Sequence, residues 1–211
     1  MLYKDRQDAG RQLAEILRKY KNEEPVIIAL PRGGVVLGYE VAKELKAPLD
    51  VITPRKIGAP FHPEFGVGAI APFGIQVLDI ETINRLRISE DEIQEIIELE
   101  TNEMNRRTNL YRKDLPPLDL KEKTVIVVDD GIATGVSTKA AIRSIKKMQP
   151  KKIILAVPVC PQDAAEKFKH EVDEFICLYA PFDFYAVGAF YDDFRQISDS
   201  EVIELLENAR A

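Results

Sequence analysis

The chain has 211 residues, of which 45% are hydrophobic and 30% charged, a composition typical of one globular domain with a sizeable core. A formal net charge of −6 argues against a protein whose main work is to neutralise nucleic-acid phosphates. Two cysteines are too few for a disulfide framework, no apolar run is long enough to cross a bilayer, and the N-terminus lacks a signal-peptide core. We therefore expect a cytoplasmic protein with no nucleic-acid or membrane partner.

The first part of the chain has the pattern of a strand–helix–strand unit behind an N-terminal helix. Apolar residues at helical spacing predict a helix over 5–20. A β-branched run predicts a buried strand over 26–30, which the sequence PRGG (31–34) ends. A helix over 35–47 and a strand over 49–54 follow. Such a unit favours a parallel sheet.

An insertion over 57–115 interrupts this pattern. Its first segment, 57–74, is rich in Gly and Pro and predicts either one long loop or a loop plus a hairpin with strands near 66–71 and 75–79. A loop of that length in a compact domain is usually functional or mobile. A capping-box pattern then starts a helix over 89–112, whose thin apolar stripe indicates a surface helix or a homodimer contact.

The second half of the chain alternates strands and helices and ends in an aromatic-rich segment and a last helix. The expected elements are strand 123–128, helix 136–147, strand 151–159, helix 162–170, strand 174–179 and helix 199–208. We therefore predict a single α/β domain over 1–211 with an open, mainly parallel five-stranded sheet of order 2-1-3-4-5, flanked by helices. Residues 180–211 would form a C-terminal hood and helix.

Two loops with unusual chemistry should meet in this fold. With the order 2-1-3-4-5, strands 26–30 and 123–128 are neighbours, so the loops PRGG and DDGIATG follow them at one edge of the sheet. Ligands of open parallel sheets bind in the crevice beyond the carboxyl ends of the strands. The two loops therefore predict one site.

The loop after strand 123–128 carries acids, glycines and hydroxyls at the start of a helix. Asp129 and Asp130 accept hydrogen bonds when ionised, so they suit the hydroxyls of a ribose or the waters of Mg²⁺. The free N–H groups of a helix start favour a phosphate. The residues expected to form that socket are Gly131, Thr134, Gly135, Ser137 and Thr138. A helix cap alone would need only one acid, so we interpret the loop as a ribose 5-phosphate site.

The PRGG loop predicts a second anion clamp. The guanidinium of Arg32 can bind two phosphate oxygens, and Gly33 and Gly34 permit close approach. Arg55 and Lys56 would either add positive charge to the site or mark a solvated strand end.

The sequence VIVVDDGIATGVST (125–138) resembles the phosphoribosyl pyrophosphate motif of the type I phosphoribosyltransferases. PRGG resembles their pyrophosphate loop, 57–74 takes the place of their flexible catalytic loop, and FYAVGAFYDDF (184–194) is similar to the hood of purine-type members. The whole chain is similar to a group of stand-alone predicted phosphoribosyltransferases.

The resemblance implies a role for each matching position. Catalysis would depend on Arg32, Lys56, Asp129 and Asp130, with both acids holding the ribose and, through water or ligand, Mg²⁺. The residues that would wrap the 5-phosphate are Ala133, Thr134, Gly135, Val136, Ser137 and Thr138. Those near the pyrophosphate would be Arg32, Gly33, Gly34 and Arg195, and those near the base Tyr185, Val187 and Asp192. A cis peptide bond would map to Pro31–Arg32.

Two departures concern the base. Ala133 stands where purine members carry an acid, and AVPVCPQ (156–162) lacks the lysine that they present to the base. We therefore predict a Mg²⁺-dependent phosphoribosyltransferase of nucleotide metabolism that moves ribose 5-phosphate between phosphoribosyl pyrophosphate and an unidentified nitrogenous base. The base is not expected to be hypoxanthine or guanine handled by the usual mechanism. The alternative is a sensor that binds phosphoribosyl pyrophosphate or a nucleotide without catalysis.

Overall fold

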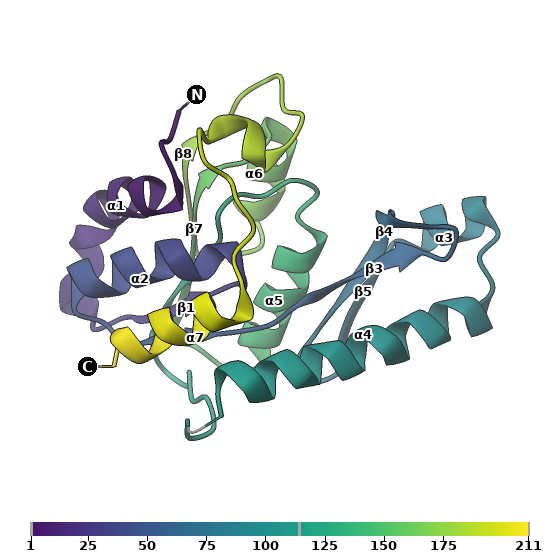
Figure 1. The fold of residues 1–211 in the computed structure, drawn as a ribbon, viewed down its shortest axis with the longest axis horizontal. Helices are drawn as coiled ribbons and strands as arrows, with labels where there is room; N and C mark the ends of the chain where they lie inside the picture. The colour runs from purple at the N-terminus through teal and green to yellow at the C-terminus, as the bar shows by residue number, and fades with distance from the viewer. Residues whose placement is uncertain (1, 114, 211) are drawn as a thin grey trace.

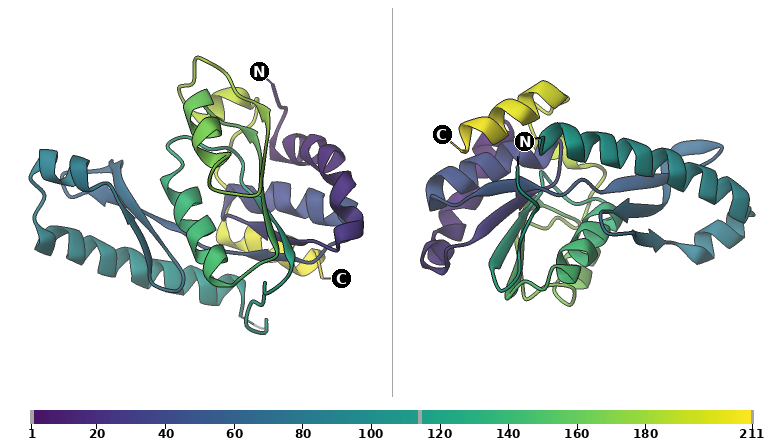
Figure 2. Two further views of the ribbon diagram at one scale, coloured as in Figure 1. Left: turned by 180° about the vertical axis from the view of Figure 1, so that it is seen from behind. Right: turned by 90° about the horizontal axis from the view of Figure 1, so that it is seen from below.

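The computed structural model describes residues 2–113 and 115–210. It has a main α/β body and an arm that projects from one side of it (Figure 1). The N- and C-terminal segments both belong to the main body, and the arm is formed by residues from the middle of the chain (Figure 2).

The main body is built on a parallel five-stranded sheet. Its order is β2-β1-β6-β7-β8, which confirms the predicted order 2-1-3-4-5 for the strands of this sheet. β1 and β6 are buried along their whole length, as expected for strands covered on both faces. The strands are β1 (Val26–Ala29), β2 (Leu49–Val51), β6 (Thr124–Val128), β7 (Lys152–Val159) and β8 (Glu174–Tyr179).

Helices cover both faces of this sheet. Their apolar residues form two clusters, one of which contains Ile27 and Ala29 and the other Ile28, because successive side chains of a strand point to opposite faces. On the first face lie α1 (Arg6–Leu17), η1 (Arg18–Glu23), α2 (Gly33–Leu45) and α7 (Asp199–Asn208). On the second lie α5 (Val136–Lys147) and α6 (Gln162–Phe168). The short helix η2 (Val187–Phe190) belongs to the C-terminal hood.

The arm combines a second, antiparallel sheet of order β3-β4-β5 with two helices. Its elements are β3 (Arg55–Ala59), β4 (His62–Ala71), β5 (Ile75–Leu78), α3 (Ile80–Leu86) and α4 (Glu90–Tyr111). The prediction of one long loop over 57–74 is therefore wrong. The hairpin alternative is confirmed, and β3 adds a third strand that the sequence did not predict.

The burial of the arm explains this difference. Ile57, Val67 and Ile70 lie under α4 and pack against Ile93 and Ile97. Gly, Ala and Pro are frequent around these strand residues, so no alternating apolar pattern was visible. The thin stripe of α4 is thus the cover of a small second core.

The arm is fixed to the main body by two sets of contacts. Ala69 and Ala71 of β4 pack against Ala140 of α5. At the C-terminal end of α4, Tyr111 is buried in the main core, and Arg112 donates two hydrogen bonds, of 2.8 and 3.1 Å, to the carboxylate of Asp50. Within the described ranges no helix combines the length and the apolar character that a membrane crossing needs.

Candidate functional site

The PRGG and DDGIATG loops are in direct contact. β1 and β6 are paired up to their last residues, Ala29 with Val128, so both chains leave the sheet at the same edge. A Cβ atom added to Gly33 would lie 1.9 Å from Oδ2 of Asp130, and one added to Gly34 would lie 2.8 Å from the carbonyl oxygen of Val128. The two loops can approach this closely only because these residues lack side chains, and the predicted meeting of the loops is confirmed.

The acid pair is largely buried and unequally partnered. Nε of Arg6 donates a 2.7 Å hydrogen bond to Oδ2 of Asp130, and the two side chains are 10% and 15% exposed. The Tyr191 hydroxyl donates to the backbone oxygen of Asp130 at 2.6 Å. Oδ1 of Asp129 accepts only the N–H of Asp130, at 2.9 Å, among the contacts within the described chain. Asp130 therefore has a fixed cationic partner and Asp129 does not.

The pKa values follow this difference. Burial and the nearby charge of Asp130 raise the pKa of Asp129 well above its usual value. Burial also raises the pKa of Asp130, but Arg6 opposes that shift through its charge and its hydrogen bond. Asp129 is thus the acid of the pair that most lacks a partner, so a cation could balance its charge or a ligand hydroxyl could donate a hydrogen bond to it.

Arg6 is a site residue that sequence reasoning missed. Besides Asp130, it donates to the carbonyl of Arg195 at 2.7 Å, and its guanidinium carbon lies 3.8 Å from the ring centroid of Phe194. Arg6 thereby joins helix α1, the DDGIATG loop (the acid loop, 129–135) and the hood. The available signal was its position, because Arg6 precedes Ala9 and Leu13 on the buried face of an amphipathic helix.

The start of α5 is a helix N-terminus that no side chain caps. Gly135 occupies the N-cap position with φ +76, a left-handed conformation that favours glycine. The N–H groups of Val136, Ser137 and Thr138 lie in the first turn, where they have no carbonyl partner within the helix. The side chains of Ala133 and Thr134 are exposed beside them. The predicted phosphate socket therefore has the backbone geometry that binds an anion.

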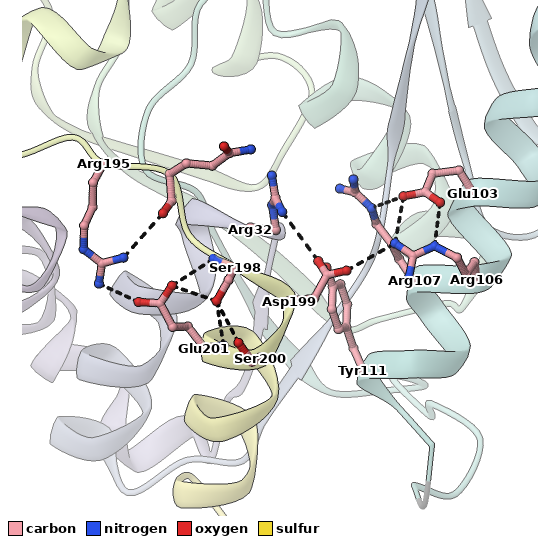
Figure 3. Close-up of polar contacts among 11 residues, drawn as sticks. Arg32, Glu103, Arg106, Arg107, Tyr111, Arg195, Ser198, Asp199, Ser200 and Glu201 are labelled. Carbon is pink, nitrogen blue, oxygen red and sulfur yellow. Dashed lines mark hydrogen bonds and ion pairs between the residues drawn. The ribbon is translucent and has the colours of Figure 1, made fainter.

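Arg32 lies at the N-cap of α2, and the peptide bond that precedes it, Pro31–Arg32, is cis, as the resemblance implied. Its side chain is one quarter exposed, and NH1 lies 3.7 Å from Oδ1 of Asp199 at the start of α7 (Figure 3). The loop thus has an arginine and a helix N-terminus next to the acid pair.

The hood is only partly in contact with the acid loop. Val187 lies against Gly131, where an added Cβ would come within 2.5 Å of its side chain. The ring of Tyr185 is 93% exposed, and Asp192 is also at the surface. The structure therefore brings Val187 to the loop, whereas Tyr185 is not packed against it.

Two predicted site residues lie apart from these contacts. The guanidinium of Arg195 pairs with Glu201 of α7 at 2.5 Å and is 60% exposed (Figure 3). Lys56 lies on β3 of the arm, aligned with Ala69 and beside Gly66. The Arg195 side chain thus points to α7, and Lys56 belongs to the sheet of the arm.

Comparison with known proteins identifies the family. The family model described as "Phosphoribosyl transferase domain" matches residues 2–191. Proteins from two strains of Mycobacterium tuberculosis, named provisionally as phosphoribosyl transferases, are 40% identical over 208 residues, 99% of this chain and 47% of theirs. The chain thus spans about half the length of these curated relatives. The crystal structure of TT1426 from Thermus thermophilus is similar with a TM-score of 0.80 and 38% identity, covering 99% of both chains. On these findings, and in agreement with the resemblance of its motifs, the chain belongs to the phosphoribosyl transferase family.

Proposed function

We propose that this protein is a Mg²⁺-dependent phosphoribosyltransferase that moves the ribose 5-phosphate of phosphoribosyl pyrophosphate to or from a nitrogenous base. The observation that carries the proposal is the contact of the two loops. The uncapped start of α5, the acid pair Asp129 and Asp130, and the PRGG loop with Arg32 lie together at the ends of β1 and β6. These groups match, in order, a phosphate, the hydroxyls of a ribose and a pyrophosphate.

Each part of the substrate has a matching element. The 5-phosphate would be bound by the backbone N–H groups at the start of α5, and one oxygen of Asp129 would accept from a ribose hydroxyl. The pyrophosphate would lie on Arg32 and the backbone of Gly33 and Gly34. In the reaction the bond between C1 and the pyrophosphate oxygen breaks, its electron pair leaves with the pyrophosphate, and a base nitrogen forms the new bond to C1.

The donor set suits Mg²⁺ that arrives with the substrate. Among the described residues no three His, Cys, Asp or Glu side chains gather to form a metal site of their own. Mg²⁺ is often held by one or two carboxylates together with substrate phosphates, and Asp129 and Asp130 provide such carboxylates. When bound, the ion would neutralise charge that develops on the leaving pyrophosphate.

The base side is the less defined half of the site. Ala133 is exposed beside the start of α5 and has no group that could move a proton on the base. Val187, Tyr185 and Asp192 of the hood remain the candidates for contact with the base. We place the reaction in the cytoplasm, whose reducing conditions suit the free cysteines Cys160 and Cys177.

A pyrophosphate-release assay tests the proposal. The purified chain is incubated with phosphoribosyl pyrophosphate, Mg²⁺ and a panel of purine, pyrimidine and other nitrogenous bases. We expect base-dependent release that Asp129→Asn abolishes. Asp163→Asn is the matched control, because this aspartate lies 72% exposed on α6 and, among the described residues, forms an ion pair with Lys167 alone.

The sensor alternative is favoured by Ala133, since binding the sugar phosphate does not require an acid at that position. Calorimetry with phosphoribosyl pyrophosphate separates the two functions. Binding without turnover of any base would establish a sensor, and the absence of both binding and turnover would contradict the whole proposal.

A further inference from the structure

The carboxylate of Asp199 joins three separate parts of the molecule. Asp199 is the first residue of α7, and its Oδ1 accepts a 2.6 Å hydrogen bond from the Tyr111 hydroxyl. Its Oδ2 accepts from Arg106 at 3.2 Å, and Oδ1 lies 3.7 Å from NH1 of Arg32 (Figure 3). The C-terminal helix, the arm helix α4 and the PRGG loop therefore meet at one side chain.

Asp199 is held in place without any help from Arg32. The Tyr111 ring is 3% exposed and belongs to the main core, so its hydroxyl is a fixed donor. Arg106 is braced in turn by two hydrogen bonds, of 2.6 and 3.0 Å, to Glu103. A capping box between Ser198 and Glu201 fixes the backbone at the start of α7. The hydrogen bond from Tyr111, followed by that from Arg106, lowers the pKa of Asp199, so the carboxylate stays charged at neutral pH.

Arg32 is the loosely held partner in this cluster. Its 3.7 Å separation from Asp199 is longer than a direct hydrogen bond, and its side chain is one quarter exposed. Asp199 is the one acidic partner of Arg32 among the described residues, and it engages a single nitrogen of a group with five N–H donors. The other donors are left for a ligand.

The charges around Asp199 favour an anionic ligand. Arg107 lies on the same turn of α4 as Arg106 and donates to Glu103 at 2.6 Å. Three arginines, at 32, 106 and 107, thus face two carboxylates, at 103 and 199, which leaves one positive charge in excess. Asp199 can restrain Arg32 without cancelling the attraction of the cluster for a polyanion.

We propose that Asp199 is a positioning residue, which holds the Arg32 side chain in the orientation that binds a pyrophosphate group. It does so as a fixed acceptor, supported by Tyr111 and Arg106 of the arm helix. This inference rests on the proposed function, because it assigns the pyrophosphate to the PRGG loop. It gives the arm a role in the site although none of its residues need touch the ligand.

Calorimetric titrations in the presence of Mg²⁺ test this role in the full chain. The ligands are phosphoribosyl pyrophosphate, inorganic pyrophosphate and ribose 5-phosphate, which lacks the pyrophosphate group. For Asp199→Asn we expect the first two to bind about three- to fivefold more weakly, the effect of losing a partly exposed ion pair. Ribose 5-phosphate should bind as tightly as it does to the wild type.

Three variants separate positioning from a loss of folding. Tyr111→Phe should weaken pyrophosphate binding in the same direction, because it removes the 2.6 Å hydrogen bond that fixes Asp199. Glu207→Gln removes the same charge from an exposed position of the same helix and should change nothing. In an Arg32→Ala background, Asp199→Asn should have no further effect on pyrophosphate binding, since residues that act through one another are not additive.

Other outcomes of these titrations would contradict the positioning role of Asp199. Unchanged or tighter pyrophosphate binding by Asp199→Asn, an equal loss for ribose 5-phosphate, or a full additional loss in the Arg32→Ala background would each overturn the positioning role. A wild-type chain that binds neither phosphoribosyl pyrophosphate nor ribose 5-phosphate would instead refute the proposed function, and this inference with it.

Discussion

The candidate site at the ends of β1 and β6 and the arm are held in their structures by different kinds of contact. At the site, single residues decide the geometry, because Gly33 and Gly34 leave no room for a side chain and one arginine neutralises a buried acid. In the arm, a cluster of apolar side chains and the partly exposed ion pair of Arg55 with Glu100 hold the sheet to α4. We infer that substitutions of these site residues should be costly, whereas substitutions at open or partly exposed positions of the arm should be tolerated.

The largest effect is expected from glycine replacement. In Gly33→Ala the new methyl group would overlap Asp130, so the loops must separate. We expect phosphoribosyl pyrophosphate to bind roughly 5- to 150-fold more weakly, which corresponds to the ~1–3 kcal/mol typical of overpacking. Gly74→Ala in the arm meets nothing within 4 Å and carries only the cost of its φ of +69, about 1–2 kcal/mol of unfolding free energy. Calorimetry and thermal unfolding measure both variants, and equal binding losses would contradict the comparison.

The second-largest difference is expected in how much an ion pair of each region contributes to the unfolding free energy. Arg6→Met leaves the largely buried Asp130 without its cation, so we expect a loss of about 3–5 kcal/mol in unfolding free energy at neutral pH. Arg55→Met removes the arm pair with Glu100, whose side chains are about one quarter exposed, and should cost less than about 1 kcal/mol. Urea denaturation gives both values. The double variant Arg6→Met/Asp130→Asn should recover part of the loss, and a full additional loss would show that the pair is not the cause.

Stability should depend on pH with opposite signs in the two regions. The pKa of Asp129 is raised, so the folded chain binds the proton of this carboxyl group more tightly than the unfolded chain does. Above the ordinary pKa of Asp, the contribution of Asp129 to the unfolding free energy therefore falls as pH rises. Arg106, and then Arg107, lower the pKa of Glu103 to about 2, so its contribution is present above the ordinary value of 4.5 and is lost as pH falls toward 2.

Two variants, each with an amide in place of the carboxyl group, test these opposite pH dependences. At pH 7 Asp129→Asn should stabilise the chain, whereas Glu103→Gln should destabilise it by less than about 1 kcal/mol, because Glu103 is partly exposed. Denaturation curves between pH 3 and pH 8 provide the measurement. A loss of stability at pH 7 in Asp129→Asn would show that burial of this charge is not costly.

The smallest effect on stability is expected for exposed aromatic and aliphatic side chains. Tyr185→Ala in the hood removes a side chain that is 93% exposed, and Leu99→Ala on α4 removes one that is 69% exposed. Each variant should therefore change the unfolding free energy by less than about 0.5 kcal/mol. Only Tyr185→Ala should raise the KM for the base. A rise in KM for Leu99→Ala as well would remove the distinction between the hood and the arm.

The parts of the fold with strong local signals were predictable. Buried β-branched runs at β1 and β6 indicated the parallel sheet, and the glycines and acids that follow them indicated where its site would lie. Strand β3 was not predictable, because the sequence RKIGA buries only Ile57 and Ala59 and depends on α4, far along the chain, for its cover. Its structure follows from tertiary packing rather than from its own pattern.

The candidate site was predictable only where its residues are close in sequence. Asp129 through Thr138 form one segment, so the sequence alone could suggest that they act together. Arg6 and Asp199 lie 124 residues before Asp130 and 167 residues after Arg32, and each looks like an ordinary charged residue of a helix. Pairings over such distances become evident only in the folded chain.

A crystal structure with ribose 5-phosphate and Mg²⁺ tests the central claim most directly. The account predicts the phosphate at the N-terminus of α5, within hydrogen-bonding distance of the backbone of Gly135 through Thr138, and a ribose hydroxyl on Asp129. A phosphate bound elsewhere, with the start of α5 left to water, would contradict it.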